Sequence, residues 1–175
     1  ILGMGPIGMC VLLPARTMGP AGVYCTDRID ARVELAKKAG ATWAGNPDRE
    51  DVLAAIREHQ PNGLDVVFEC CGQQSAVDQC IEILKPGGKL MMIGIPEVDR
   101  ISFQVDQMRR KEITLYNVRR QEGCVQSALD FIEQGTIDVG PMVTHRFPFD
   151  ASTEAFDLVA GYEDGVLKAM IEFDV

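Results

Sequence analysis

The chain is short of the residues and patterns that several classes of protein need. Only 2 of its 175 residues are histidine, and neither has an acidic partner at ligand spacing, so we expect no metal site within this chain. It carries 17 basic against 26 acidic side chains, a net charge of −9, and no basic stripe. The protein is therefore not expected to bind nucleic acid.

Long apolar runs and paired cysteines are also missing. No stretch of 18 or more apolar residues occurs, and no basic segment precedes an apolar run and a cleavage site, so we expect neither a membrane span nor a signal peptide. The 6 cysteines form no CxxC pair and fit neither a zinc knuckle nor a disulfide framework. We expect buried, reduced thiols and a cytoplasmic protein.

What remains is typical of a globular protein, with 46% hydrophobic and 25% charged residues. The length allows one sizeable core, so one domain with an appendage is the simplest organisation. Residues 122–175 hold 11 acidic and 2 basic side chains, and this segment is expected to be solvated surface. Because the first residue is isoleucine, we expect the chain to be a piece of a longer polypeptide.

Strand and helix signals alternate along the chain. The strand segments are short and apolar without a period of two, which is typical of parallel strands covered on both faces. This pattern predicts an α/β fold of the Rossmann type, a doubly wound parallel sheet with helices on both faces and a short C-terminal helix–strand extension. The predicted strands are 1–3, 22–26, 65–70, 89–94, 113–116, 142–146 and 168–173, and the predicted helices are 6–18, 30–39, 48–59, 75–84 and 123–134.

The start of the chain, ILGMGPIG, contains a G-x-G-x-x-G pattern at a predicted strand-to-helix turn. Gly3 permits the tight turn, Gly5 lets a diphosphate approach the backbone, and Gly8 lets the helix pack close to the sheet. Pro6 fits the first helical position, where its missing N–H costs nothing. Asp27 directly follows the next predicted strand and lies 19 residues beyond Gly8, close to the expected separation of about 20.

This arrangement predicts a dinucleotide site. The free amides of Ile7 and Gly8, with the positive end of the helix dipole, would face the diphosphate. Asp27 would bind the adenosine ribose hydroxyls and repel a 2′-phosphate, which favours NAD over NADP, although Arg28 could pair with such a phosphate. A glycine turn used only for packing and a different nucleoside ligand, such as a methyl donor, are the alternatives.

A few other residues depart from the simple pattern. Pro14 lies inside the first predicted helix, and we expect a bend near residues 10–14 or an early helix end. The segment 109–111 (RRK) is expected to be a solvated helix end. His59 is expected to be a solvated surface residue, and His145 and Glu69 are expected to have structural rather than catalytic roles.

The chain resembles the cofactor-binding half of the zinc-dependent medium-chain dehydrogenase/reductase family, most closely its polyol, or sorbitol dehydrogenase-like, branch. The resemblance covers nearly the whole chain in the family's order. It is carried by the segments LGMGPIG, TDRIDARVELAKKAGA, DVVFECCG, LKPGGKLMMIGIP, RRKEITLYNVRR and VTHRFPFDASTEAFDL.

The resemblance implies a two-domain enzyme whose separate N-terminal domain carries the catalytic zinc. Residues 1–146 would form the NAD(P)-binding domain, and residues 147–175 a return segment that packs on the N-terminal domain. The complete protein would transfer hydride from an alcohol or polyol to NAD, with zinc as Lewis acid. The chain alone is expected to bind NAD without turnover, and to contain no catalytic residue or metal ligand of its own.

The resemblance also implies individual roles. Arg120 would lie near the substrate; in the polyol branch an aromatic residue follows this arginine, whereas Gln121 follows it here. The implied cofactor-binding residues are Gly3, Gly5, Pro6, Ile7, Gly8, Asp27, Arg28, Arg32, Cys71, Gly94, Ile95, Pro96, Val118 and Arg119.

We further expect a homodimer or higher homo-oligomer, formed through the strand at residues 142–146. Two other functions stay open at this point. One is a stand-alone NAD-sensing regulatory module, and the other is a zinc-free reductase of the same superfamily.

Overall fold

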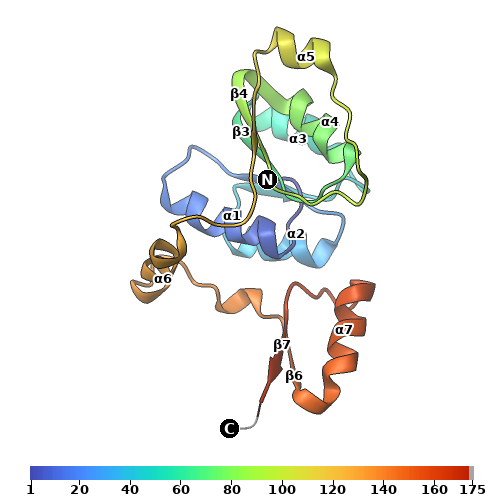
Figure 1. Cartoon of the computed structure of the whole chain (residues 1–175). Helices are drawn as coiled ribbons and strands as arrows, with labels where there is room; N and C mark the ends of the chain where they lie inside the picture. The colour runs from blue at the N-terminus through green and yellow to red at the C-terminus, as the bar shows by residue number, and fades with distance from the viewer. Residues whose placement is uncertain (174–175) are drawn as a thin grey trace.

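The computed structural model describes residues 1–173, which form a main α/β layer structure and a smaller C-terminal unit (Figure 1). No helix in this part of the chain is both long and apolar enough to cross a membrane. The helices are α1 (Pro6–Thr17), α2 (Asp30–Lys38), α3 (Val52–His59), α4 (Gln74–Ile83), α5 (Val105–Arg110), α6 (Val125–Glu133) and α7 (Ser152–Gly161), with 3₁₀ turns η1 (Gly140–Met142) and η2 (Phe149–Ala151). The strands are β1 (Tyr24–Thr26), β2 (Trp43–Gly45), β3 (Leu64–Glu69), β4 (Leu84–Met92), β5 (Thr114–Asn117), β6 (His145–Pro148) and β7 (Ala169–Glu172).

The main sheet is parallel and is joined at its centre by Leu2. One half consists of β1 and β2, and the other of β3, β4 and β5. Leu2 bridges to Thr26 at the end of β1 and to Glu69 at the end of β3. The resulting order β2–β1–Leu2–β3–β4–β5 is that of the doubly wound dinucleotide-binding fold, with its reversal point beside Leu2. The predicted fold class is confirmed.

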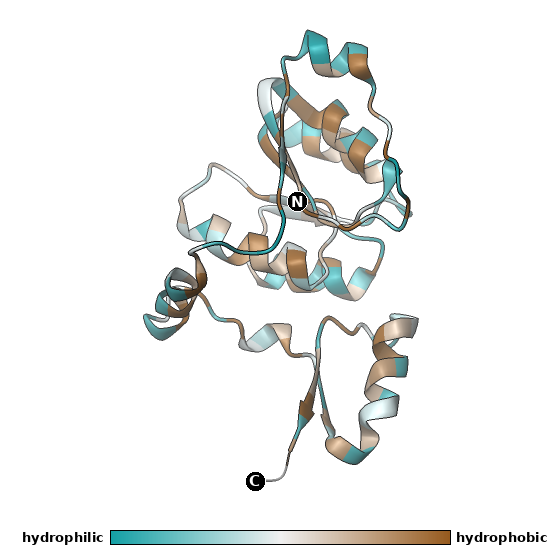
Figure 2. Cartoon of the chain, in the orientation of Figure 1, coloured by the Kyte–Doolittle hydropathy of each residue, from teal (hydrophilic) through white to brown (hydrophobic). Residues whose placement is uncertain are grey.

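Helices cover both faces of this sheet because neighbouring strand residues point to opposite sides. Tyr24 and Val67 pack in an apolar cluster with residues of α3 and α4. Their neighbours Cys25 and Phe68 pack in a second cluster with residues of α1 and α2. Figure 2 shows apolar residues along α4 and the strands β3 and β4 beside it. The short central strands thus separate two cores.

The C-terminal unit is a β–α–β arrangement set apart from the main sheet (Figure 1). β6 pairs in parallel with β7, and α7 connects them. The strand predicted over residues 142–146 is wrong in its bounds, because Met142 lies in η1 and packs into the cluster formed by α1 and α2. The predicted boundary at residue 147 falls inside β6, and residues 174–175 of the predicted return segment lie outside the described residues.

Three local details differ from the sequence pattern. The first helix continues past Pro14 to Thr17, so an early helix end is wrong, while a bend stays a prediction. β2 is not evident from the sequence, because two of its 3 residues are alanine and glycine, which are depleted in strands. Of α5 only the end, at residues 109–111, is expected from the sequence. α3 begins at Val52 rather than at residue 48, since the side chain of Asp51 accepts a 3.0 Å hydrogen bond from the Ala54 amide and caps the helix.

Lys111 ties α5 to the end of α4. Its Nζ donates to the carbonyl oxygens of Ile81, Glu82 and Leu84 at 2.9, 2.8 and 2.8 Å. Carbonyls in the last turn of a helix have no intrahelical donor, so the ammonium group caps α4. Burial lowers the pKa of Lys111. The expectation of a solvated helix end is therefore wrong for this residue.

Candidate functional site

A cleft opens at the carboxyl end of the main sheet, beside Leu2. Its volume is about 880 Å³, within the ~300–1,000 Å³ typical of small-molecule sites. One wall comes from the loops after β1 and β2, and the other from the loop after β3 and from α4. In open parallel sheets ligands bind where the strand order reverses, so the position also indicates a ligand site. Five of the predicted residues line it, namely Gly3, Asp27, Arg28, Arg32 and Cys71.

The glycine turn brings α1 unusually close to the end of the first strand segment. Gly3 has a φ of +92°, which favours glycine. A β-carbon on Gly8 would lie 1.9 Å from the carbonyl oxygen of Gly3, so only glycine fits there. Gly5 is the N-cap residue of α1, Pro6 is its first residue, and no side chain of the described residues caps its first turn. The amides of that turn are left for a ligand.

Asp27 fixes the geometry of this turn. Its Oδ2 accepts a 2.6 Å hydrogen bond from the Met4 amide, and its Oδ1 accepts a 2.8 Å hydrogen bond from the Ile29 amide. Each carboxylate oxygen can accept a second hydrogen bond, so the group can also bind hydroxyls in the cleft. The same side chain therefore holds the glycine turn in place and presents a negative charge to the ligand.

Two arginines flank the cleft in different ways. Arg28 is exposed, and its Nε donates a 2.7 Å hydrogen bond to Asp48, which raises the pKa of Arg28. Arg32 is only partly exposed, and its Nη1 lies 3.5 Å from the position of a β-carbon on Gly5. The first guanidinium is thus paired with a carboxylate, whereas the second lies against the start of α1.

Glu69 organises the opposite wall from inside the sheet. It is fully buried, and its Oε1 accepts hydrogen bonds from the amides of Cys71 and Gly72 at 2.8 and 2.7 Å. Its Oε2 has no hydrogen-bond partner among residues 1–173. A β-carbon on Gly94 would lie 2.5 Å from that oxygen, and one on Gly72 would lie 2.5 Å from the Ile95 carbonyl oxygen. The Glu69 carboxylate therefore holds the loop that follows β3, while the Glu69 backbone carbonyl accepts 2.9 Å hydrogen bonds from the Ile93 and Gly94 amides in the loop that follows β4.

The six cysteines are free thiols, but they are not all buried. Cys25 and Cys80 are buried, whereas Cys10, Cys71 and Cys124 are exposed, so the expectation of buried thiols is wrong for these three. The sulfur of Cys71 lies 3.0 Å from Glu69 Oε1 and donates to it. Burial of this sulfur and its hydrogen bond to Glu69 raise the pKa of the Cys71 thiol to about 12.

Cys71 is therefore expected to alkylate slowly, although the residue is exposed. With a pKa of about 12, about one molecule in 10,000 carries the thiolate at pH 8, and the thiolate is the reactive form. Its rate with iodoacetamide, followed by mass spectrometry, should rise about tenfold per pH unit from pH 7 to 10 without levelling off. Glu69→Gln should accelerate it by removing the negative acceptor. Alkylation as fast as at exposed Cys124 would contradict this.

The remaining predicted residues are not among those that line the cleft. Gly5, Pro6, Ile7 and Gly8 form the start of α1, which follows the lining residue Gly3 in the chain. Gly94, Ile95 and Pro96 lie next to the Cys71 loop, and the Ile95 side chain is exposed. Val118 continues the main sheet, with its amide bonded to the Met92 carbonyl at 2.9 Å. Val118, Arg119 and Arg120 are exposed and are not brought to the cleft.

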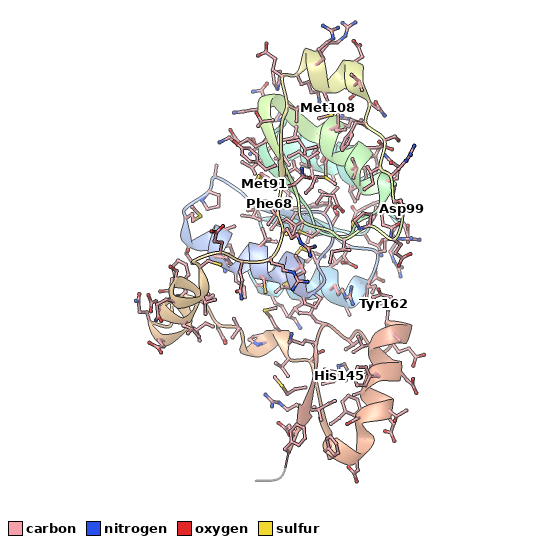
Figure 3. The ribbon with its side chains drawn as sticks, in the orientation of Figure 1. Phe68, Met91, Asp99, Met108, His145 and Tyr162 are labelled. Carbon is pink, nitrogen blue, oxygen red and sulfur yellow. The ribbon has the colours of Figure 1, made fainter. Side chains whose placement is uncertain are left out.

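Other residues enter the site without any sequence signal. The loop after β2 contributes Pro47 and Asp48, and α4 contributes Gln79. Asn46, which is buried, donates to the Arg28 carbonyl at 2.9 Å and so holds the loop after β1. Tyr162, at the end of α7, also lines the cleft, although it lies far along the chain from the glycine turn (Figure 3).

A second cavity of about 560 Å³ lies between α1, α2 and residues 136–142. Arg16 and Lys38, which belong to the carboxyl-terminal ends of the two helices, line it. Carboxyl-terminal helix ends expose carbonyl oxygens rather than free amides, so they offer no backbone donors to a diphosphate. The larger cleft at the glycine turn is therefore the better candidate for a nucleotide.

Two kinds of bound group can be tested against these residues. A dinucleotide fits, because the first turn of α1 lacks a side-chain cap and Asp27 presents a carboxylate beside it. A metal ion does not, since no three His, Cys, Asp or Glu side chains gather at metal-binding distance within residues 1–173.

Comparison with known proteins agrees with this geometry. Residues 6–134 match the sequence profile of a family described as zinc-binding dehydrogenase. Sorbitol dehydrogenase from Bacillus subtilis (strain 168) is 28% identical over 172 residues, which cover 98% of this chain and 49% of that protein. The chain spans about half the length of the curated relatives it matches.

Solved structures give the same result. An oxidoreductase of unknown specificity from Escherichia coli matches with a TM-score of 0.92 and 26% identity, covering 99% of this chain and 50% of that one. A protein from Sinorhizobium meliloti 1021 bound to NADP matches with a TM-score of 0.88 and 26% identity, covering 98% and 51%. The family profile spans α1 and the strands β1 to β5, which is more than half of the chain, and this chain belongs to the zinc-binding dehydrogenase family.

Proposed function

We propose that this chain binds NAD for a dehydrogenase that oxidises a small alcohol or polyol. The observation that carries the proposal is the cleft at the reversal point of the sheet, which Asp27 lines together with Gly3, the first residue of the glycine turn that leads into the uncapped start of α1. The names of the relatives, which include sorbitol dehydrogenase, support an alcohol or polyol substrate.

Different residues would bind the diphosphate, the adenosine ribose and the nicotinamide of the cofactor. The amides of Ile7 and Gly8 would donate to the diphosphate, and the absence of a β-carbon on Gly5 leaves room for it. Asp27 would accept hydrogen bonds from the adenosine ribose. The loops held by Glu69 and Gly94 would carry the nicotinamide end. The nicotinamide supplies hydride transfer, and the protein supplies its position.

The charges of the cleft support NAD rather than NADP. Asp27 presents a negative charge where a 2′-phosphate would lie. Arg28, the cation that could pair with that phosphate, already donates to Asp48 at 2.7 Å. A similar protein from Sinorhizobium meliloti 1021 is bound to NADP, so the preference of this chain for NAD is tested by titration with both dinucleotides.

Replacing Asp27 tests the proposal directly. Asp27→Asn keeps an acceptor for the Met4 amide but removes the negative charge. Each hydrogen bond to a charged group is worth about 1.5–3 kcal/mol, so NAD affinity should fall about 10- to 100-fold. The preference for NAD over NADP should shrink at the same time. Calorimetric titration with both dinucleotides measures both effects.

The matched control is Asp65→Asn. Asp65 is an exposed carboxylate at the start of β3, paired with Lys85 and remote from the cleft. Its replacement should leave both affinities unchanged, and thermal unfolding of each variant checks the fold. A wild-type chain that binds neither dinucleotide would refute the proposed function.

Three further properties belong to the same proposal. Exposed aromatic residues, with Phe149, Phe156 and Phe173 exposed by 62%, 70% and 65%, support packing of residues 147–175 against additional protein. We also propose that the protein forms a homodimer through the edge of β6 and that it is located in the cytoplasm. Arg120 is proposed to lie on the substrate side in the complete protein.

A further inference from the structure

The turn that follows α7 reaches from the C-terminal unit to the nucleotide cleft. Tyr162 ends the helix in the left-handed conformation, with φ 53° and ψ 34°. Val166 and Leu167, which follow it, are 2% and 3% exposed. A β-carbon on Gly165 would lie 2.7 Å from the Ala31 side chain, so the turn is pressed against the start of α2. The turn is thus anchored to the main core.

This anchored turn holds Arg32 from two sides. The Arg32 guanidinium carbon lies 5.2 Å from the centre of the Tyr162 ring, within cation–π range. Nη2 of Arg32 donates to the Val166 carbonyl at 3.1 Å. Nε of Arg32 is buried and has no hydrogen-bond partner among residues 1–173. Figure 3 labels Tyr162 at the end of α7 that faces α2.

The third neighbour of Arg32 is the glycine turn. Nη1 of Arg32 lies 3.5 Å from the position that a β-carbon on Gly5 would take. Gly5 is the residue that precedes the uncapped first turn of α1. Both Arg32 and Tyr162 line the cleft. Without the ring and the Val166 carbonyl, a long arginine side chain would sample many rotamers, and ordering it would cost binding free energy.

We propose that Tyr162 is a positioning residue for the cofactor, because its ring fixes the Arg32 guanidinium over the glycine turn where the diphosphate binds. The proposal rests on the proposed function and adds to it a coupling between the C-terminal unit and the nucleotide site. The ligand is a nucleoside diphosphate group, recognised by a cation oriented in advance.

The test is a double-mutant cycle on NAD affinity, measured by calorimetry with the full chain. Tyr162→Gly removes the ring but keeps a residue that tolerates positive φ, so the turn can fold. An exposed cation–π contact is worth about 0.5–1 kcal/mol, which corresponds to a two- to five-fold loss of affinity. Tyr162→Phe keeps the ring and should retain wild-type affinity.

The second arm removes the arginine. Arg32→Gln alone should weaken NAD binding about tenfold, the size expected for one charge-assisted contact. In that background Tyr162→Gly should cause no further loss, since the ring acts only through Arg32. Phe156→Ala, an exposed aromatic on the same helix, should leave affinity unchanged.

The outcomes separate the proposals. An unchanged affinity in Tyr162→Gly, or the same fold-loss in the presence and absence of Arg32, would overturn the role of Tyr162 while the cofactor site stands. A loss in Tyr162→Gly accompanied by an equal loss in Tyr162→Phe would also overturn it. If the wild-type chain binds no NAD, the proposed function fails first, and the inference fails with it.

Discussion

Gly8→Ala is expected to lower the free energy of unfolding by about 3 kcal/mol. The added β-carbon would lie 1.9 Å from the Gly3 carbonyl oxygen and 2.9 Å from the Gly3 carbonyl carbon. Both are backbone atoms of the central strand segment, so the overlap is relieved only by moving α1 away from the sheet. Overpacking of this kind costs about 1–3 kcal/mol where side chains can adjust, and here they cannot. Urea denaturation followed by circular dichroism measures the loss.

Gly5→Ala is the matched control for this substitution. Gly5 has a φ of −66°, and its β-carbon would contact only the flexible tip of Arg32, at 3.5 Å. The free energy of unfolding should therefore stay within about 1 kcal/mol of wild type. NAD affinity should nevertheless fall, because the methyl group occupies the approach of the diphosphate. Equal stability losses at Gly5 and Gly8 would contradict this account of the turn.

Glu69→Ala is expected to lower the free energy of unfolding by about as much as Gly8→Ala, but through the loss of hydrogen bonds rather than through overpacking. The substitution leaves the amides of Cys71 and Gly72 without their acceptor, and each unsatisfied buried donor costs about 1–3 kcal/mol. Loss of the unpartnered Oε2 offsets part of this, so a net loss of about 3 kcal/mol follows. Chemical denaturation again gives the value, and NAD affinity should fall as the loop moves.

Glu69→Gln separates the acceptor from the charge. Its side-chain carbonyl can still accept from both amides, so it should lose less than half as much stability as Glu69→Ala. Equal losses in the two variants would show that the buried charge, rather than the hydrogen bonds to Cys71 and Gly72, stabilises this wall of the cleft.

The sequence predicts the elements that carry their own local signal. The glycine turn, the apolar strands and the acid at the end of β1 follow from spacing and residue type, and the sheet order follows once they are placed. β2 (Trp43–Gly45) is missed because two of its three residues are alanine and glycine, which are depleted in strands, whereas β1 contains tyrosine and threonine. The strand over residues 142–146 is misplaced because Met142 is apolar through packing against α1 and α2, not through strand pairing.

The site is less predictable than the fold because several of its contacts join distant parts of the chain. The hydrogen bond from Arg32 to Val166 spans 134 positions, and nothing local marks Tyr162 as a cleft residue. Asp27 and Gly3 could be identified because both follow adjacent strands. The assignment of Val118 and Arg119 as cofactor-binding residues comes from the family resemblance alone, and their contact with a cofactor stays a prediction.

The two halves of the main sheet meet at Leu2, a junction that we call the seam, and this affects how readily the sheet opens locally. Hydrogen bonds from Leu2 to Phe68 and from Gly3 to Thr26 are among the few that connect the halves of the sheet there. The cleft above the seam takes Asp27 from one half and Cys71 from the other. A nucleotide bound in the cleft would contact both halves of the sheet and stabilise their junction. Local opening of the sheet at Leu2 would then become rarer, and amide hydrogen exchange there would slow when the cofactor is present.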